Sequence, residues 1–161
     1  MKKLSIILCA LLVGTAAFAS PDVDTITAAS GSSYYKNSSY DLQDLKDALG
    51  GYPYPTAISV ATVNADGSPN ISVVIPGLSA DGRYLTFGLA GNRTRANFTE
   101  RDLAVVLFYE YRPEAGKSER NKGCKVVVRY VGDYANKRLN TEAGNEKPSL
   151  FMEIVEILPI G

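Results

Sequence analysis

Three short runs of alternating apolar and polar residues, joined by two Asp-Gly turns, constrain the fold of this chain most strongly. The runs cover residues 57–63, 70–75 and 83–88. Asp66-Gly67 and Asp81-Gly82 separate them, and glycine tolerates the positive φ that a tight turn requires. Connections this short form antiparallel hairpins, because a parallel crossover needs a dozen or more residues.

Three further runs extend the predicted sheet. Residues 103–108 are continuously apolar, a pattern typical of a strand buried on both faces. Residues 125–131 form a fifth strand, and residues 150–158 alternate as a final one. The six runs predict an all-β-dominated fold, a small six-stranded antiparallel barrel with short helices. Closure of the barrel would leave no exposed sheet edge.

Two short helices accompany the predicted strands. Over residues 41–49, leucines recur at spacings of three and four, the first residue is an N-cap, and Gly50-Gly51 ends the helix. Residues 92–101 form the second helix, with Asn92 as its N-cap. The polar segment 133–147 has room for one helical turn.

Residues 1–19 have the pattern of a secretory signal peptide. Two lysines precede a short apolar stretch, and Ala17-Phe18-Ala19 forms a small-x-small cleavage site. We therefore expect cleavage before Ser20 and export to the periplasm or the medium. A flexible segment over residues 20–39 would then precede a single domain at 40–161.

The composition excludes several classes of function. Removal of residues 1–19 leaves 15 basic and 17 acidic residues, a balance that gives no reason to expect nucleic-acid or membrane binding. Cys9 follows Leu8, where a lipoprotein signal requires a small residue, so no lipid anchor is expected. Cys124 is then a lone cysteine and reads as a small buried strand residue. The sequence has no histidine, which removes histidine bases and histidine metal or haem ligands.

The junction between the third strand and the second helix concentrates positive charge. Arg93, Thr94 and Arg95 open that helix directly after the turn at residues 88–91. The first amides of a helix have no internal acceptor, and the helix dipole adds partial positive charge there. A phosphate at this point would meet amide donors, a hydroxyl group and guanidinium groups. A pair of solvated surface arginines is the alternative interpretation.

The same stretch resembles a known family. Residues 61–69 (Ala-Thr-Val-x-x-Asp-Gly-Ser-Pro), 81–87 (Asp-Gly-Arg-Tyr-Leu-Thr-Phe) and 92–98 (Asn-Arg-Thr-Arg-Ala-Asn-Phe) are similar to the pyridoxamine 5′-phosphate oxidase-like family of FMN-binding split barrels. The resemblance covers residues 57–158. It implies a split β-barrel, FMN as cofactor, and a homodimer that holds two flavins at its interface. Four aromatic residues would line that interface, stack near the flavin ring, or simply pack within the barrel: Tyr84, Phe87, Tyr109 and Tyr111.

The resemblance also implies roles for individual residues. Arg93 matches the family's phosphate-binding arginine, and Thr94 or Arg95 takes the place of the lysine that follows it. Asn92 stands where a serine is usual. Ser72 and Thr86 are further candidates for polar contacts with the cofactor, on the wall of the barrel.

Two departures from the family pattern keep the function open. Ser72 and Gly77 stand at or near positions where family oxidases carry an arginine and a lysine, so two phosphate or ring contacts are missing. The Trp- and His-containing closing segment of the pyridoxamine phosphate oxidases is also missing, so that activity is not expected. We expect either an exported FMN-dependent oxidoreductase of unknown substrate or a non-catalytic split-barrel binding protein without FMN. Haem binding is disfavoured by the lack of histidine.

Overall fold

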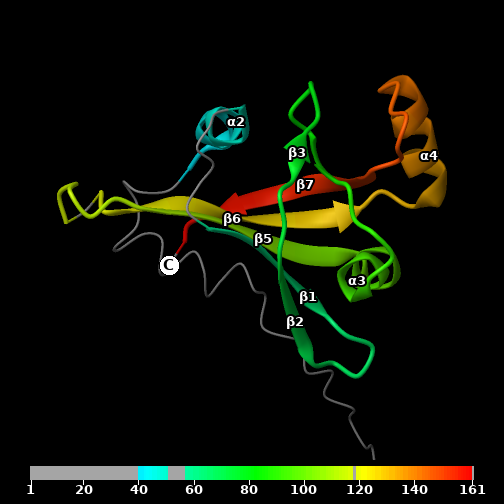
Figure 1. Ribbon diagram of the computed structural model, residues 1–161, viewed down its shortest axis with the longest axis horizontal. Coiled ribbons are helices and arrows are strands. Elements are labelled where there is room, and N and C mark those ends of the chain that lie inside the picture. Colours follow the sequence, from blue (N-terminus) through cyan, green and yellow to red (C-terminus); the bar gives the residue numbers. More distant parts are fainter. Residues whose placement is uncertain (1–39, 51–56, 118, 161) are drawn as a thin grey trace, which may run out of the picture.

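The structure is a computed structural model that describes residues 40–50, 57–117 and 119–160 (Figure 1). The predicted signal peptide and the segment 20–39 lie outside the described residues. Within the described part of the chain, no helix is both long enough and apolar enough to cross a membrane.

Seven antiparallel strands form one curled sheet, in the order β2-β1-β5-β6-β7-β4-β3. The strands are β1 Ala57–Val63, β2 Pro69–Val73, β3 Gly77–Leu78, β4 Tyr84–Phe87, β5 Leu103–Tyr111, β6 Asn121–Tyr130 and β7 Leu150–Leu158. Three short helices accompany them: α2 Leu42–Gly50, α3 Arg93–Arg101 and α4 Asp133–Glu142. Figure 1 shows α2 and α4 toward opposite ends of the long strands, with α3 beside the β1–β2 hairpin.

The prediction of a mainly antiparallel β fold is confirmed, but the predictions of six strands and of closure are wrong. The seventh strand is β3, whose two residues pair with β4 through Gly77 and Thr86. A sheet that ends in β2 and β3 is an open half-barrel. The chain leaves the sheet between these strands at Pro76, which has no N–H to donate to a ladder.

Both predicted Asp-Gly turns are present and share one mechanism. Gly67 has φ of 82° and Gly82 has φ of 71°, so each turn uses the left-handed conformation that glycine adopts readily. Asp66 Oδ1 accepts hydrogen bonds from the Ser68 amide at 3.0 Å and the Ser68 hydroxyl at 2.6 Å. Asp81 Oδ1 closes the second turn in the same way. These local bonds explain why the hairpins could be recognised from sequence.

The core lies on the concave face of the long β5–β6 ribbon. Alternate side chains of these strands point into it, and they are the fully or nearly fully buried residues Ala104, Val106, Phe108, Cys124, Val126 and Val128. The opposite face of β5 is not buried as predicted, since Leu103 is 48% exposed and Val105 only partly covered. The outer face of this open sheet therefore exposes apolar side chains, a feature that often marks an interaction surface.

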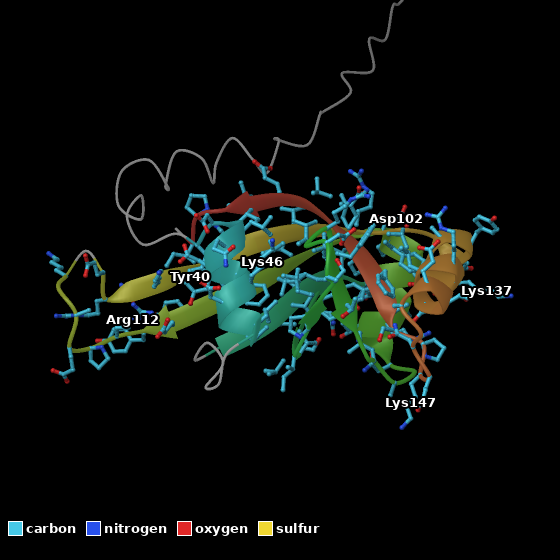
Figure 2. All side chains as sticks on the ribbon, turned by 90° about the horizontal axis from the view of Figure 1, so that it is seen from above. Tyr40, Lys46, Asp102, Arg112, Lys137 and Lys147 are labelled. Atoms are coloured by element: carbon cyan, nitrogen blue, oxygen red, sulfur yellow. The ribbon has the colours of Figure 1, made fainter. Side chains whose placement is uncertain are left out.

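The helices begin where the sequence indicates, but one is longer than expected. Asp41 caps α2 by accepting a hydrogen bond from the Asp44 amide at 2.8 Å. Residues 133–142 form the ten-residue helix α4, where we expected a single turn. Seen from above, α2 crosses the β5–β6 ribbon near Tyr40, whose amide donates to the Gly123 carbonyl at 2.9 Å (Figure 2).

Candidate functional site

The start of α3 has the geometry of a helix N-terminus with unused donors. Asn92 is in extended conformation, and its side-chain oxygen accepts the Arg95 amide at 2.9 Å, as predicted for an N-cap. The Ala96 amide donates to the Asn92 carbonyl at 3.1 Å. Within the described residues, the amides of Arg93 and Thr94 have no acceptor. Two backbone donors at the positive end of the helix dipole are therefore available to an anion.

Thr94 points into the protein and belongs to a buried polar network. The side chain is 5% exposed. Its hydroxyl lies 2.7 Å from the Ser72 hydroxyl and accepts a hydrogen bond from the Asn70 amide group at 3.2 Å. Two of the predicted site residues, Thr94 and Ser72, are thus brought together by the packing of α3 on β2.

Asn97, one turn further along α3, extends the same network to β1. Its side-chain amide donates to the Thr62 hydroxyl at 3.0 Å and to the Asn64 side-chain oxygen at 2.9 Å. Asn70 also donates to Thr62, at 3.0 Å. Sequence reasoning missed Asn70, Asn97 and Thr62. A signal was present, because Asn70 and Ser72 alternate onto one face of a strand and Thr94 and Asn97 share one face of a helix.

Arg93 and Arg95 lie on opposite sides of α3. Residues two apart in an α-helix point about 200° apart, so the two flank Thr94. Arg93 is exposed, on the side of the β1–β2 turn. There it contributes, after the Ser68 hydrogen bonds, to a lowered pKa of the Asp66 carboxyl. Arg95 is partly buried and donates from Nη1 to the Leu89 carbonyl at 3.0 Å. The two guanidinium groups therefore do not form one clamp.

Thr86 and Gly77 pair with each other at the far end of the sheet. They are register partners in the β3–β4 ladder. A Cβ placed on Gly77 would lie 2.6 Å from the Thr86 hydroxyl oxygen, so any larger residue here would require a shift of Thr86. Among the hydrogen bonds of the described residues, none joins Thr86 to the network around Thr94.

An apolar cavity of about 400 Å³ lies between the end of β2 and the first residues of the segment that leads from β4 to α3. Its lining residues come from the end of β2 and from the segment after β4: Val73, Val74, Ile75, Phe87, Gly88 and Leu89. Because Leu89 also accepts the hydrogen bond from Arg95, α3 and the cavity wall are directly coupled. The cavity is within the size range of small-molecule pockets and is open to ring-shaped apolar ligands.

Solved structures of other proteins have the same architecture. An FMN-binding protein from Syntrophomonas wolfei subsp. wolfei matches with a TM-score of 0.53 and 18% sequence identity, over 74% of this chain and 86% of that chain. The chain has the split-barrel fold. HupZ from Group A Streptococcus matches with a TM-score of 0.46 and 20% identity, over 73% of this chain and 92% of that one. HutZ, a haem storage protein from Vibrio cholerae, matches with a TM-score of 0.41 and 14% identity, over 74% and 89%. No family model and no curated protein sequence matches the chain.

The outer face of this split barrel carries several highly exposed apolar side chains. Three consecutive outward positions of β2 and the segment after it are 69–85% exposed: Ile71, Val73 and Ile75. Across the same face, a cavity of about 510 Å³ is lined mainly by apolar residues of β1, β5, β6 and β7, among them Val63, Leu103 and Val155. A continuous apolar surface of this kind marks an interaction site rather than ordinary solvent-facing sheet.

The four aromatic residues have separate environments. Phe87 is buried against Phe98 of α3, with ring centroids 5.0 Å apart, and Tyr84 packs edge-on against Phe151 at 6.0 Å. These contacts are barrel packing, although Phe87 also lines the apolar cavity. The Tyr109 hydroxyl donates to Asn121 at 2.7 Å. Tyr111 is 48% exposed on the hairpin that extends beyond the sheet.

Cys124 has the character of a core residue. The side chain is fully buried, and burial, together with the nearby Asp44 carboxylate, raises the pKa of the thiol to about 12. A thiol of this kind stays protonated at neutral pH and is a poor nucleophile or metal ligand. The prediction of a buried strand residue is confirmed.

Proposed function

We propose that the chain is an FMN-binding split-barrel protein that acts as a flavin-dependent oxidoreductase. The single observation that carries this proposal is the adjacency of two features. Unused amide donors of Arg93 and Thr94 begin α3, and Gly88 and Leu89 of the segment that leads into this helix line an apolar cavity of about 400 Å³. A phosphorylated ligand with an apolar ring system requires that pair of features. The match to an FMN-binding protein agrees with the fold that the proposal assumes.

The residues present fit the phosphate end of such a cofactor in a defined way. The phosphate would accept hydrogen bonds from the Arg93 and Thr94 amides, with the Arg93 guanidinium supplying charge from the open side. Thr94 and Ser72 would act by holding the start of α3 on β2, since their hydroxyls are bonded to each other. Arg95 would hold the 88–91 segment through the Leu89 carbonyl.

The ring system would lie in the apolar cavity, against the strand end at residues 73–75. Phe87 and Leu89 supply its apolar wall, and Phe87 is fixed by its contact with Phe98. The flavin supplies the redox chemistry when bound, by accepting and returning electrons. The chain's own part is to bind it, orient it and limit its contact with water.

Titration of the purified protein with FMN tests this proposal. Retention of flavin absorbance after gel filtration is the expected result, with retention lost in Arg93→Ala. Arg138→Ala is the matched control, because Arg138 lies on α4 and, among the described residues, pairs only with Glu142, both side chains being 60% exposed. A protein that stays colourless after incubation with FMN would refute the proposal.

A non-catalytic binding protein without FMN is the second candidate, favoured by one specific observation. Strand β2 presents Ser72 toward α3, at or near a position where family oxidases carry an arginine, and the Ser72 hydroxyl is already engaged with Thr94. On this alternative, the cavity binds an uncharged apolar ligand, and Arg93→Ala leaves that binding unchanged.

Self-association and export complete the proposal. We propose that two copies associate through the outer apolar face, which carries Ile71, Val73 and Ile75, because burial of such side chains is favourable by about 1.5–3 kcal/mol each.

We also propose that the protein is exported and cleaved, on the basis of the signal-peptide pattern in residues 1–19. N-terminal sequencing of the protein from its host should then begin at Ser20 rather than Met1.

A further inference from the structure

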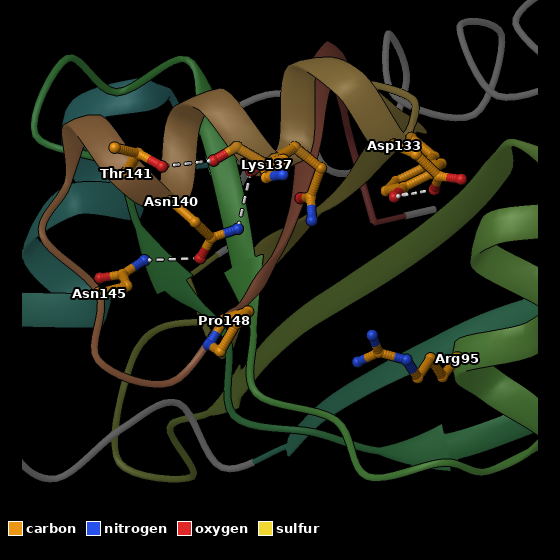
Figure 3. Close-up of a pocket in the computed structure, with 9 residues that line it drawn as sticks. Arg95, Asp133, Lys137, Asn140, Thr141, Asn145 and Pro148 are labelled. Atoms are coloured by element: carbon orange, nitrogen blue, oxygen red, sulfur yellow. Dashed lines mark hydrogen bonds between the residues drawn. The ribbon is translucent and has the colours of Figure 1, made fainter.

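A second cavity, of about 350 Å³, lies between the start of α3 and helix α4. Arg95 reaches toward it from α3, and the opposite wall is formed by α4 and the segment that follows it (Figure 3). The lining is polar, in contrast to the apolar cavity near residues 73–75. Its principal side chains are Arg95, Tyr130, Asp133, Asn136, Lys137 and Asn145.

Several of these side chains retain unused hydrogen-bonding capacity. Arg95 donates one N–H to Leu89, which leaves most of its guanidinium donors available. Asn136 accepts the Phe151 amide through its oxygen, so its NH₂ group has no acceptor among the described residues. Asn145 donates to Asn140, which leaves its own side-chain oxygen as an acceptor. Lys137 makes no ion pair within the described part of the chain.

The charge of the lining favours a ligand with a single negative charge. Arg95 and Lys137 are positive, and Asp133 is the one carboxylate among the residues that line the cavity. Asp133 accepts a hydrogen bond from the Tyr130 hydroxyl at 2.8 Å. Burial, followed by this bond and the charge of Asp133, raises the pKa of Tyr130 to about 12, so the hydroxyl remains protonated at neutral pH. With Asp133 offsetting one of the two cations, the lining carries a net charge of +1, which a monoanion neutralises.

This cavity is separate from the flavin site proposed above. Arg93 and Arg95 point to opposite sides of α3, and Arg95 alone of the two lines the α3–α4 cavity. The apolar cavity shares no lining residue with it. Arg95, which lines the α3–α4 cavity, donates to the carbonyl of Leu89, which lines the apolar cavity.

We propose that the α3–α4 cavity binds a small hydroxycarboxylate, with the carboxylate on the Arg95 guanidinium and the hydroxyl groups on Asn136 and Asn145. Arginine forms two parallel hydrogen bonds with a carboxylate, which fixes one end of the ligand. The amide groups of α4 then complement hydroxyl groups, which both donate and accept. Lys137 adds attraction at the rim of the cavity.

Isothermal titration of the purified protein with D-gluconate tests this inference. Glucose is the uncharged comparison and glycerol 3-phosphate the dianionic one. We expect saturable binding of gluconate, no saturable binding of glucose, and weaker binding of glycerol 3-phosphate. Absence of saturable gluconate binding would overturn the inference, and equal or tighter binding of glycerol 3-phosphate would overturn the assigned ligand class.

Three variants locate the binding. Arg95→Gln should weaken gluconate binding by about tenfold or more, the effect of losing a charge-assisted hydrogen bond. Lys137→Gln should weaken gluconate binding by a smaller factor. The Lys137 side chain is exposed and unpaired within the described residues, so this substitution should not disturb folding. Arg93→Gln should leave gluconate binding unchanged. Equal losses in Arg93→Gln and Arg95→Gln would place the ligand elsewhere. FMN titration of Lys137→Gln, expected to match the unmodified protein, separates this result from failure of the flavin proposal.

Discussion

At the scale of single residues, the orientation of Thr94 decides how the start of α3 works. A threonine in the first turn of a helix could present its hydroxyl to an anion, but here the side chain is buried and bonded to Ser72 and Asn70. The groups proposed to face the anion are then the exposed Arg93 side chain and the backbone amides, and the position of the amides depends on how firmly α3 is held against β2. The hydroxyl network is therefore a positioning device.

Replacement of Thr94 by valine tests that role. Valine keeps the shape of threonine but leaves Ser72 and Asn70 without their shared partner, which should lower the free energy of unfolding by about 1–2 kcal/mol. Urea denaturation measures the change. Thr141→Val is the matched control, because Thr141 is exposed and its hydroxyl bonds only to the Lys137 carbonyl in the part of the chain that the structure describes. Equal effects of the two substitutions would show that the network does not hold α3.

Residue patterns predicted local features and missed distant ones. The Asp-Gly turns and the Asn92 cap depend on bonds between residues two to three apart, so the sequence displays them directly. The bonds from Thr94 to Ser72 and from Asn97 to Thr62 join residues 22 and 35 apart. They depend on the strand register and on the rotation of α3, and no local propensity encodes either.

At the scale of elements, α2 is attached to the β5–β6 ribbon by charged contacts. Lys122 donates to Asp44 at 3.2 Å and lies 5.4 Å from the centre of the Tyr40 ring. The Tyr40 hydroxyl donates to Glu110 at 3.2 Å, and Arg112 pairs with the same carboxylate at 2.8 Å. Figure 2 shows Tyr40 and Arg112 along this ribbon beneath and beyond α2. These contacts make the position of α2 sensitive to pH.

The pKa of Asp44 gives the direction of that sensitivity. The Asp41 amide lowers it first, and the Lys122 ammonium lowers it further. A carboxyl whose pKa falls on folding stabilises the folded state above its unfolded pKa, and that contribution is lost as pH falls through the folded value.

We therefore expect the protection of α2 amides from hydrogen exchange to decrease below about pH 4, where carboxyl groups begin to protonate. Asp44→Asn should lower that protection at neutral pH and flatten its pH dependence. Asp47→Asn is the control on the same helix, because within the described ranges the Asp47 carboxylate accepts a hydrogen bond only from Gln43. A pH profile that is identical in Asp44→Asn and the unmodified protein would contradict this account.

Element lengths were less predictable than element types. The residues of α4 are polar, and we expected one turn rather than ten residues of helix. The helix is held by Asn140, whose side chain donates to the Asn136 and Ser149 carbonyls and accepts the Ser149 amide, all at 2.8 Å. A buried asparagine that ties a helix to the next strand leaves no periodic apolar pattern to recognise.

At the scale of the whole molecule, the open half-barrel exposes a face that a monomer would be expected to cover. Closure was predicted because it removes sheet edges, yet the sheet ends at β2 and β3. The exposed side chains of β2 are apolar, and the cavity of about 510 Å³ on the outer face is largely apolar as well. A second copy is the occupant we propose for this face.

A charge placed on β2 tests that occupant. Val73→Asp should convert a dimer to a monomer without unfolding it, because the Val73 side chain is 85% exposed in the single chain. Tyr134→Asp is the matched control, since Tyr134 on α4 is also 85% exposed and lies away from the outer face. Light scattering after gel filtration measures the mass. A monomeric unmodified protein, or a dimer that survives Val73→Asp, would rule out this interface.

The central claim is that the start of α3 holds the phosphate of a flavin nucleotide, and a comparison of FMN with riboflavin tests it most directly. The two ligands share the ring and differ in the phosphate. Fluorescence titration should show FMN binding tighter than riboflavin by about ten- to a hundredfold, as expected for charge-assisted hydrogen bonds, and Arg93→Ala should remove most of that difference. Equal affinities for the two ligands in the unmodified protein, or a preference for FMN that persists in Arg93→Ala, would contradict the claim.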